Sequence, residues 1–235
     1  DYLLRDSLYC GVTYGKYDLD RFVSTLTAYK HNNQLQLAIE RGGVQALEEF
    51  VLARYFMFIQ VYFHKTRRYL DKVLVKGLKA VLPNGKYPDT TSEYLKWDDT
   101  RILNLIAESE NDDVMAFKKR KIMTCVLESK AHSGTADKIN ARMIFNILKK
   151  EYRDRVVFDS VDKTAHKLTP MILSHKDDSG KGIMILDEKT GEVKDIMEES
   201  IILESIVKPI SINRIYAENE IADEALVRIK ELQSA

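Results

Sequence analysis

One long helical pattern constrains the fold of this chain more than any other feature. It runs from Val44 to about Leu82, contains no proline, and has Gly77 as its only internal glycine. At 1.5 Å per residue an unbroken helix of this length would span roughly 55–60 Å, so we expect a kink or break within it. Its middle, FVLARYFMFIQVYF, is apolar on nearly every side, which indicates burial inside a domain or at an interface.

Shorter patterns lie on both sides of this segment. Residues 1–10 predict an amphipathic helix, and residues 24–43 predict a β-hairpin that turns at His31-Asn32-Asn33. After a loop at 83–93, Thr91 or Ser92 is expected to cap a helix over EYLKWDDTRILNLIAES. Two further helices are expected, over residues 112–130 and 136–151.

After about residue 155 the sequence changes from mainly helical patterns to short strand-like patterns. A hairpin is predicted by GIMILDEKTGEVKDI, in which apolar and polar residues alternate around Lys189-Thr190-Gly191. Two strand-like segments follow, SIILESI and INRIYAE. ADEALVRIKELQ closes the chain as a helix. We therefore predict a mainly α fold with a small α+β C-terminal lobe, divided into a helical part (1–154) and the lobe (155–235).

Composition narrows the class of protein. Lys+Arg and Asp+Glu number 36 each, so no net charge favours nucleic acid or an acidic membrane. Cys10 and Cys125 are a single pair in a long chain, which indicates reduced thiols rather than a disulfide framework. No apolar run reaches the roughly 18–20 residues that a membrane span needs, and no signal peptide is evident. We expect a cytoplasmic protein without a membrane partner.

Common catalytic motifs are absent. The sequence contains no CxxC, HExxH, GxSxG or Walker-type loop, and its five histidines are scattered. We therefore expect no metal site built from this chain alone and assign it no catalytic residue.

Two groups of residues remain as candidates for ligand contact. On a helix, Tyr2, Arg5 and Asp6 project to one side and suit a ligand with a flat face, hydroxyls and negative charge. The alternative is that Asp1 and Arg5 form an ordinary surface ion pair.

The second group is basic and follows the apolar middle of the long pattern. His64, Lys65 and Arg68 share a helix face. A phosphate chain would satisfy these charges, but acidic residues on a neighbouring helix or plain solvent exposure would also do so. Arg21 and Arg153 lie near predicted helix ends, where on sequence alone they are surface charges.

The opening segment, DYLLRDSLYCGVTYGKYDLDRF, resembles the end of the catalytic core in HD-superfamily deoxynucleoside triphosphate triphosphohydrolases. The pattern of that family is D-x-x-D-Y-x-x-R-D, a glycine turn and F/Y-D-x-x-R-F, and this chain enters it at the second aspartate. Later helices of the family are similar to ARYFMFIQVYFHKTRR and ILKKEYRDRVVF. The predicted C-terminal hairpin and strand resemble the C-terminal lobe of the family more loosely. The resemblance implies an HD-domain-like helical body with a hairpin and strand–helix lobe.

The resemblance also implies roles for individual residues. Tyr2 would pack on the deoxyribose and exclude a ribose 2′-hydroxyl, and Asp6 would accept a hydrogen bond from the 3′-hydroxyl. His64, Lys65 and Arg68 would approach the triphosphate, although Thr66 and Arg67 both lie near the position of the family's phosphate-contacting arginine.

Positions that contact activator nucleotides between subunits in allosteric members of the family are matched by Arg21 and Arg153. Val157 stands where those members have a basic residue, which departs from the family pattern. The partners implied are a dNTP substrate, an activator nucleotide and further copies of the chain in a dimer or tetramer.

The metal-binding signature of the superfamily is missing. Its chemistry uses an H…HD…D set whose metal ions activate water, and no His-Asp dipeptide occurs in these 235 residues. We therefore expect the C-terminal portion of an enzyme that hydrolyses dNTPs to deoxynucleoside and triphosphate, with its divalent metal ligands outside this chain. Two alternatives are a nucleotide-sensing or oligomerisation module without turnover, and a helical nucleic-acid-binding protein, which the balanced charge disfavours.

Overall fold

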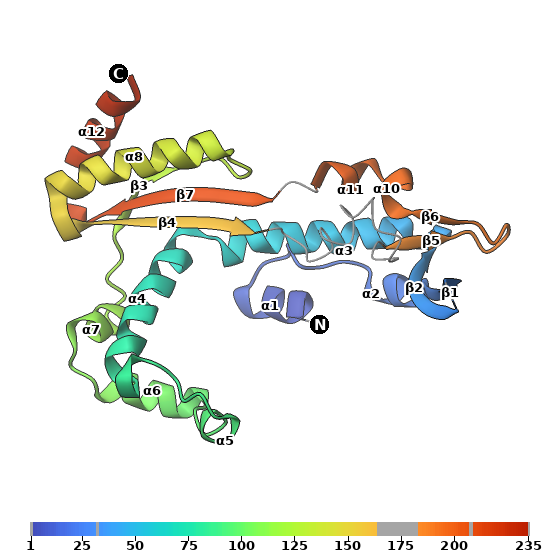
Figure 1. Ribbon diagram of the computed structural model, residues 1–235, viewed down its shortest axis with the longest axis horizontal. Coiled ribbons are helices and arrows are strands. Elements are labelled where there is room, and N and C mark those ends of the chain that lie inside the picture. The colour runs from blue at the N-terminus through green and yellow to red at the C-terminus, as the bar shows by residue number, and fades with distance from the viewer. Residues whose placement is uncertain (1, 32, 164–182, 207–208, 235) are drawn as a thin grey trace. The chain divides into compact units, whose positions relative to one another are not determined.

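The computed structural model is mainly helical with two small sheets, which confirms the predicted fold class (Figure 1). It describes residues 2–31, 33–163, 183–206 and 209–234. Asp1, Asn32, His166 and His175 therefore lie outside the described residues.

The chain forms two compact units, and each is described by itself. The first comprises Asp1–Tyr62 and Val161–Ser211, and the second Phe63–Ser160 and Ile212–Ala235. These units do not follow a boundary near residue 155, because each combines an early segment with a late one. In the second unit this happens because a strand near the C-terminus pairs with a strand from the middle of the chain.

The first unit combines helices with a four-stranded sheet. Its elements are α1 (Tyr2–Cys10), α2 (Leu19–Ser24), β1 (Leu26–His31), β2 (Gln34–Glu40), α3 (Val44–Met57), the π-helical turn η2 (Phe58–Tyr62), β5 (Met184–Leu186), β6 (Val193–Asp195), α10 (Ile196–Glu199) and α11 (Ile201–Ile206). The sheet order is β1-β2-β5-β6.

Strand pairing and a small apolar core hold the first unit together. The predicted hairpin is confirmed: β1 and β2 pair antiparallel with His31 opposite Gln34, and β5 pairs parallel to β2. The second predicted hairpin is confirmed by the antiparallel β5–β6 pair. Ile39, Leu47, Val51 and Ile196 form the buried core between the sheet and α3.

The second unit is built around a three-stranded sheet of order β3-β7-β4. Its elements are α4 (Lys65–Val81), α5 (Thr91–Tyr94), α6 (Asp99–Glu108), α7 (Asp112–Lys118), β3 (Thr124–Glu128), α8 (Thr135–Tyr152), β4 (Val156–Lys163), β7 (Ile210–Ala217) and α12 (Ala222–Ser234). β4 and β7 extend into residues assigned to the first unit.

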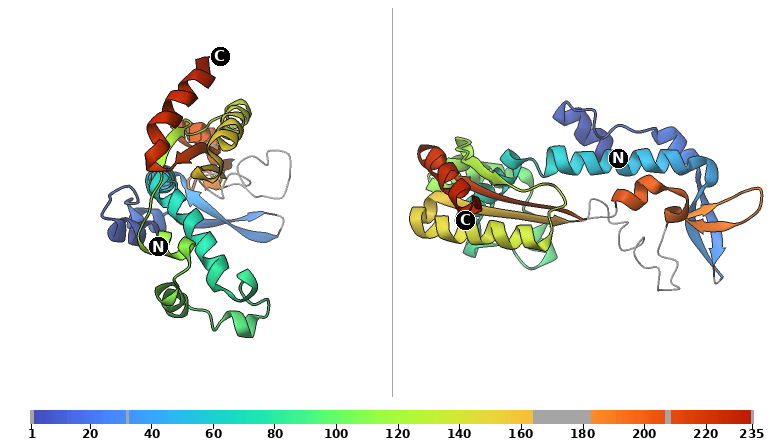
Figure 2. Two further views of the ribbon diagram at one scale, coloured as in Figure 1. Left: turned by 90° about the vertical axis from the view of Figure 1, so that its left-hand side faces the viewer. Right: turned by 90° about the horizontal axis from the view of Figure 1, so that it is seen from above.

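The two faces of this sheet have different partners. α8 and α12 cover one face, where Ile215 of β7 packs with Leu148 and Ile229 (Figure 2). α4 packs on the other face, where Tyr69 contacts Tyr216 with ring centroids 5.2 Å apart. The alternation of Ile215 and Tyr216 follows from the two-residue period of a strand.

The long helical pattern breaks, as expected. α3 ends at Met57, a π-helical turn follows, and α4 starts at Lys65 after His64 adopts an extended ψ of 135°. The predicted helices over 136–151 and 222–233 are confirmed as α8 and α12.

Three predicted elements are wrong. The helix expected over 93–109 is two helices, because the Asp98 carboxylate accepts from the Arg101 N–H at 2.8 Å and begins a new one. The helix expected over 112–130 ends at Lys118 and is followed by strand β3. SIILESI is not a strand but helix α11, because the Ser200 hydroxyl accepts from the Leu203 N–H at 3.1 Å as an N-terminal cap.

The two thiols are expected to differ in reactivity. Burial, and to a lesser degree the Glu128 carboxylate, raises the pKa of Cys125 to about 11, whereas Cys10 is exposed. At pH 8 only about a thousandth of Cys125 would be thiolate, so the native chain should show one fast thiol towards DTNB. Cys10→Ser should remove this fast phase and Cys125→Ser should leave it unchanged.

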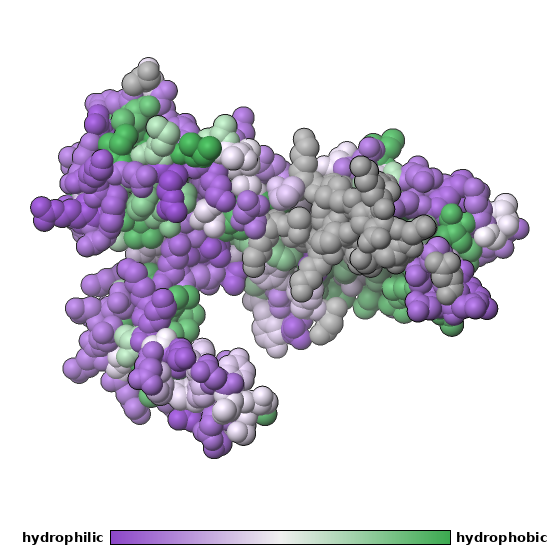
Figure 3. Space-filling model, in the orientation of Figure 1, coloured by the Kyte–Doolittle hydropathy of each residue, from purple (hydrophilic) through white to green (hydrophobic). Residues whose placement is uncertain are grey.

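Polar residues cover most of the face seen in Figure 3, with apolar residues gathered over the region of α8 and α12. Ile139, Met143 and Val227 are among the exposed apolar side chains of these two helices. None of the described helices combines the length and apolar character needed to cross a membrane.

Candidate functional site

Helix α1 is anchored by its buried face. Leu3 and Ser7, one turn apart, are both 1% exposed. The Ser7 hydroxyl accepts from the Gly15 N–H at 2.8 Å and donates to the Met57 sulfur at 3.5 Å. This fixes the rotation of α1 against α3, so that Tyr2 and Asp6, four residues apart, lie together on another side of α1.

Tyr2 and Asp6 meet side chains from α3 and the π-helical turn. The Tyr62 hydroxyl donates to Asp6 Oδ2 at 2.5 Å, and Arg54 Nη1 donates to the Tyr2 hydroxyl. The Tyr2 and Tyr62 rings are 6.5 Å apart between centroids, and the Phe58 and Tyr62 rings 5.1 Å. We call these five residues the aromatic–carboxylate cluster.

The cluster combines positive charge, negative charge and aromatic faces. The Arg54 guanidinium lies 5.5 Å from the Tyr2 ring centroid and 5.3 Å from that of Phe58, within the range of cation–π attraction. Burial raises the pKa of Tyr62 far above its usual value, and the hydrogen bond to Asp6 raises it further. Burial also raises the pKa of Tyr2, although Arg54 opposes this. Both phenols therefore stay protonated at neutral pH and can donate.

The π-helical turn at Phe58–Tyr62 is part of the site rather than of the core, since none of its residues is buried. Its wider turn has i→i+5 hydrogen bonds, a rare geometry that often marks functional sites. Sequence reasoning placed Tyr2 and Asp6 on one helix face but missed Arg54 and Tyr62. The only available signal was the spacing of Arg54, Phe58 and Tyr62 at four-residue steps in an apolar helix.

The third member of the opening group is at the edge of this site. Arg5 Nε lies 3.8 Å from Asp6 Oδ1, with 55% of its side chain exposed. The alternative pairing with Asp1 lies outside the described residues. Arg5 is thus an exposed ion-pair partner of Asp6, which in turn accepts from Tyr62.

His64, Lys65 and Arg68 belong to the second unit and differ in environment. His64 and Lys65 are exposed at the start of α4, where the Lys65 carbonyl accepts from the Tyr216 hydroxyl at 2.9 Å. Arg68 instead makes a bidentate pair with Asp159, at 3.1 Å from Nε and 2.8 Å from Nη2. An acidic partner was one of the alternatives considered for this group, and here it comes from strand β4 rather than from a helix.

Asp159 is shared by further cations. Its side chain is 0% exposed, with Lys72 Nζ at 3.3 Å and Arg214 Nη1 at 4.0 Å. Arg214, 3% exposed, also donates from Nε to Glu128 at 2.6 Å. We call Arg68, Lys72, Glu128, Asp159 and Arg214 the Asp159 network. It ties α4 to all three strands of the sheet.

Arg21 and Arg153 lie in different units. Arg21 Nη2 donates to the Gly42 carbonyl at 2.8 Å, next to the hairpin of the first unit. Arg153 is exposed after α8 with a φ of 55°, a left-handed value that is uncommon for a residue other than glycine. The activator-nucleotide contacts of Arg21 and Arg153 stay predictions.

Gly15 offers a test of how α1 is held. A Cβ at this position would lie 2.6 Å from the Leu3 carbonyl oxygen, a backbone atom that cannot move aside freely. Gly15→Ala is therefore expected to destabilise the protein by about 1–3 kcal/mol in urea denaturation. Gly134→Ala is the matched control, because its Cβ would have no neighbour closer than 3.9 Å. Equal stability of the two variants would show that α1 is loosely held.

The described residues contain no group of three or more His, Cys, Asp or Glu side chains that could hold a metal ion. The aromatic–carboxylate cluster supplies one carboxylate, and its other polar groups are phenols and a guanidinium. Its chemistry fits recognition of hydroxyls and anions better than metal binding.

Comparison with known proteins identifies the family of this chain. Residues 17–162 match the HD associated region family, and the chain belongs to that family. The chain is 25% identical over 228 residues to the uncharacterized protein YwfO of Bacillus subtilis, covering 88% of this chain and 51% of the relative. It is 30% identical over 111 residues to the uncharacterized protein MJ1154 of Methanocaldococcus jannaschii, covering 47% of this chain and 24% of the relative. The chain thus spans about half of the first relative and less of the second.

Two solved structures share the fold. A hypothetical protein from Aquifex aeolicus superposes with a TM-score of 0.75 at 28% identity, covering 97% of this chain and 56% of that one. A phosphohydrolase from Bacteroides thetaiotaomicron superposes with a TM-score of 0.62 at 22% identity, covering 93% and 60%.

Proposed function

We propose that this chain is the C-terminal part of a metal-dependent HD phosphohydrolase that hydrolyses dNTPs to deoxynucleoside and triphosphate. The observation that carries the proposal is the aromatic–carboxylate cluster. It brings Tyr2 and Asp6, the two residues that the family resemblance assigns to the sugar, together with Arg54 and Tyr62. The name of the Bacteroides structure, a phosphohydrolase with the same fold, supports the reaction class.

In this proposal the cluster forms the sugar-facing wall of the nucleotide pocket. The Tyr2 ring packs against the deoxyribose and leaves no room for a ribose 2′-hydroxyl. Asp6 accepts from the 3′-hydroxyl, and the hydrogen bond from Tyr62 keeps the carboxylate oriented. Arg54, held by Tyr2, supplies positive charge for the phosphate end of the substrate.

The basic residues at the start of α4 divide into two roles. His64 and Lys65 are exposed and remain the proposed triphosphate contacts. Arg68 is already neutralised by Asp159, so we infer that it holds α4 on the sheet and contributes to substrate binding only indirectly.

The divalent metal ion of the reaction does not fit the described residues, because they offer no suitable group of ligands. We therefore propose that its ligands lie outside this chain, and assign no catalytic step to the residues described. We further propose a homo-oligomer, with Arg21 and Arg153 contacting an activator nucleotide.

The experiment uses the full-length protein that contains this chain. Incubation with Mg²⁺ or Mn²⁺ and each dNTP, followed by chromatography, should yield deoxynucleoside and triphosphate in equal amounts, with little turnover of the matching NTPs. Release of nucleoside monophosphate and pyrophosphate would contradict the reaction. Saturable dNTP binding without any product would favour the nucleotide-sensing alternative.

A further inference from the structure

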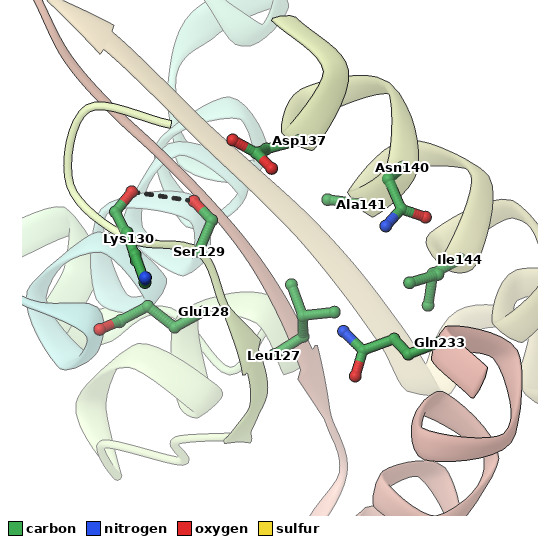
Figure 4. A pocket seen from close by; sticks show the side chains of 9 residues that line it. All are labelled: Leu127, Glu128, Ser129, Lys130, Asp137, Asn140, Ala141, Ile144 and Gln233. Carbon is green, nitrogen blue, oxygen red and sulfur yellow. Dashed lines mark hydrogen bonds between the residues drawn. The ribbon is translucent and has the colours of Figure 1, made fainter. Parts of the chain in front are cut away.

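A cavity of about 400 Å³ lies in the second unit between the end of β3, helix α8 and the last turn of α12 (Figure 4). Its apolar floor is formed by Leu127, Ala141 and Ile144. The volume is at the lower end of the range for small-molecule sites, which suits a compact ligand. The aromatic–carboxylate cluster belongs to the other unit and contributes nothing to this cavity.

Three polar side chains at this cavity have no hydrogen-bond partner in the described part of the chain. They are the carboxamides of Asn140 on α8 and Gln233 on α12, and the ammonium of Lys130 after β3. Figure 4 shows the two carboxamides facing the space above the floor from different helices, with Lys130 across from Asn140. Carboxamides both donate and accept, so they suit either end of a polar ligand.

Two carboxylates complete the lining, and each has one oxygen engaged. Asp137 Oδ2, in the first turn of α8, accepts from the N–H of the N-cap residue Gly134 at 2.9 Å, and Glu128 Oε2 accepts from Arg214 Nε at 2.6 Å. The second oxygen of each has no partner among the residues described. The cavity therefore presents a cation and carboxylates around one apolar floor. A purely anionic ligand would be repelled by the carboxylates, and a purely cationic ligand would be repelled by Lys130.

We propose that this cavity binds a small zwitterion of the amino-acid type with an aliphatic body. Its ammonium pairs with Asp137, its carboxylate pairs with Lys130, and its body covers Leu127 and Ile144. Asn140 and Gln233 hydrogen-bond the two ends. This inference does not depend on the proposed phosphohydrolase activity.

The test is isothermal titration calorimetry of the full-length protein that contains this chain, with L-leucine and two isosteres that each lack one charge. Isoamylamine lacks the carboxylate and 4-methylpentanoate lacks the ammonium. Leucine should bind saturably, and each isostere should bind at least about tenfold more weakly, because each loses one charged hydrogen-bonded contact. No saturable leucine binding up to about 10 mM, or equal binding of all three compounds, would overturn the proposal.

Variants locate the site. Asn140→Leu and Gln233→Leu should each weaken leucine binding by about fivefold or more. Both side chains are exposed and unpartnered, so folding should be preserved and is checked by circular dichroism. Asn146→Leu, an exposed asparagine of the same helix that does not line the cavity, should leave the affinity unchanged. Equal loss in Asn146→Leu and Asn140→Leu would place any binding elsewhere.

Discussion

Replacing Asp159 with asparagine is expected to lower the free energy of unfolding by roughly 3–5 kcal/mol. The substitution keeps the shape of the side chain but removes the charge that Arg68, Lys72 and Arg214 share. Arg214 Nη1 is already buried without a hydrogen-bond partner in the part of the chain described. Urea denaturation measures the loss. Asp154→Asn, which removes an exposed partner of Lys149, should change stability little.

The Asp159 carboxylate also makes the stability of the protein depend on pH. Burial alone would raise the pKa of Asp159, but the hydrogen bonds and charges of Arg68 and Lys72 lower it below its usual value. Because the folded state binds this proton less readily than the unfolded state, the stabilisation is fully present above about pH 4 and is lost as pH falls through the folded pKa. The wild type should therefore lose stability on acidification more steeply than Asp159→Asn. Parallel curves for the two proteins would show that the Asp159 charge contributes nothing.

Tyr2→Ala and Asp6→Ala are each expected to reduce dNTP turnover in the full-length enzyme by about a hundredfold, because each removes a group that positions the sugar. This prediction rests on the proposed function. Tyr62→Phe should have a smaller effect, since the Asp6 carboxylate remains but loses its oriented donor. Steady-state kinetics with separate kcat and KM values measure these effects.

Tyr9→Ala is the matched control, because Tyr9 is on the same helix but 84% exposed. It should retain normal turnover. Near-normal kcat in Tyr2→Ala and Asp6→Ala would mean that α1 has only a structural role, even if the enzyme hydrolyses dNTPs.

Local patterns predicted the elements whose signals come from short stretches of sequence. The β1–β2 and β5–β6 hairpins, the break in the long helix, α8 and α12 all follow from periodicity and turn residues. Strand β3 was missed because TCVLE is short and follows a basic helix end. α11 was mistaken for a strand because isoleucine favours strands, whereas the Ser200 cap and the burial of Leu203 stabilise a helix.

The candidate site was predictable only where its residues are neighbours in sequence. Tyr2 and Asp6 are one turn apart, so their common face could be read directly. Tyr62 is 56 residues from Asp6, and Asp159 is 91 residues from Arg68. Partners at such separations depend on packing, which periodicity does not encode. Arg68 illustrates this limit of periodicity: the sequence left a phosphate ligand, acidic residues of a neighbouring helix and solvent exposure open, and the structure pairs Arg68 with Asp159.

The π-helical turn has a geometric consequence for Arg54, Phe58 and Tyr62. Residues four apart in an α-helix overshoot a full turn of 3.6 residues, so a row at this spacing winds gradually around the helix. A wider turn absorbs that overshoot and straightens the row. The Arg54 guanidinium then lies 5.3 Å from the Phe58 ring centroid, and that centroid lies 5.1 Å from the Tyr62 ring centroid. An uninterrupted α-helix would instead place Tyr62 about 80° around the helix axis from Arg54.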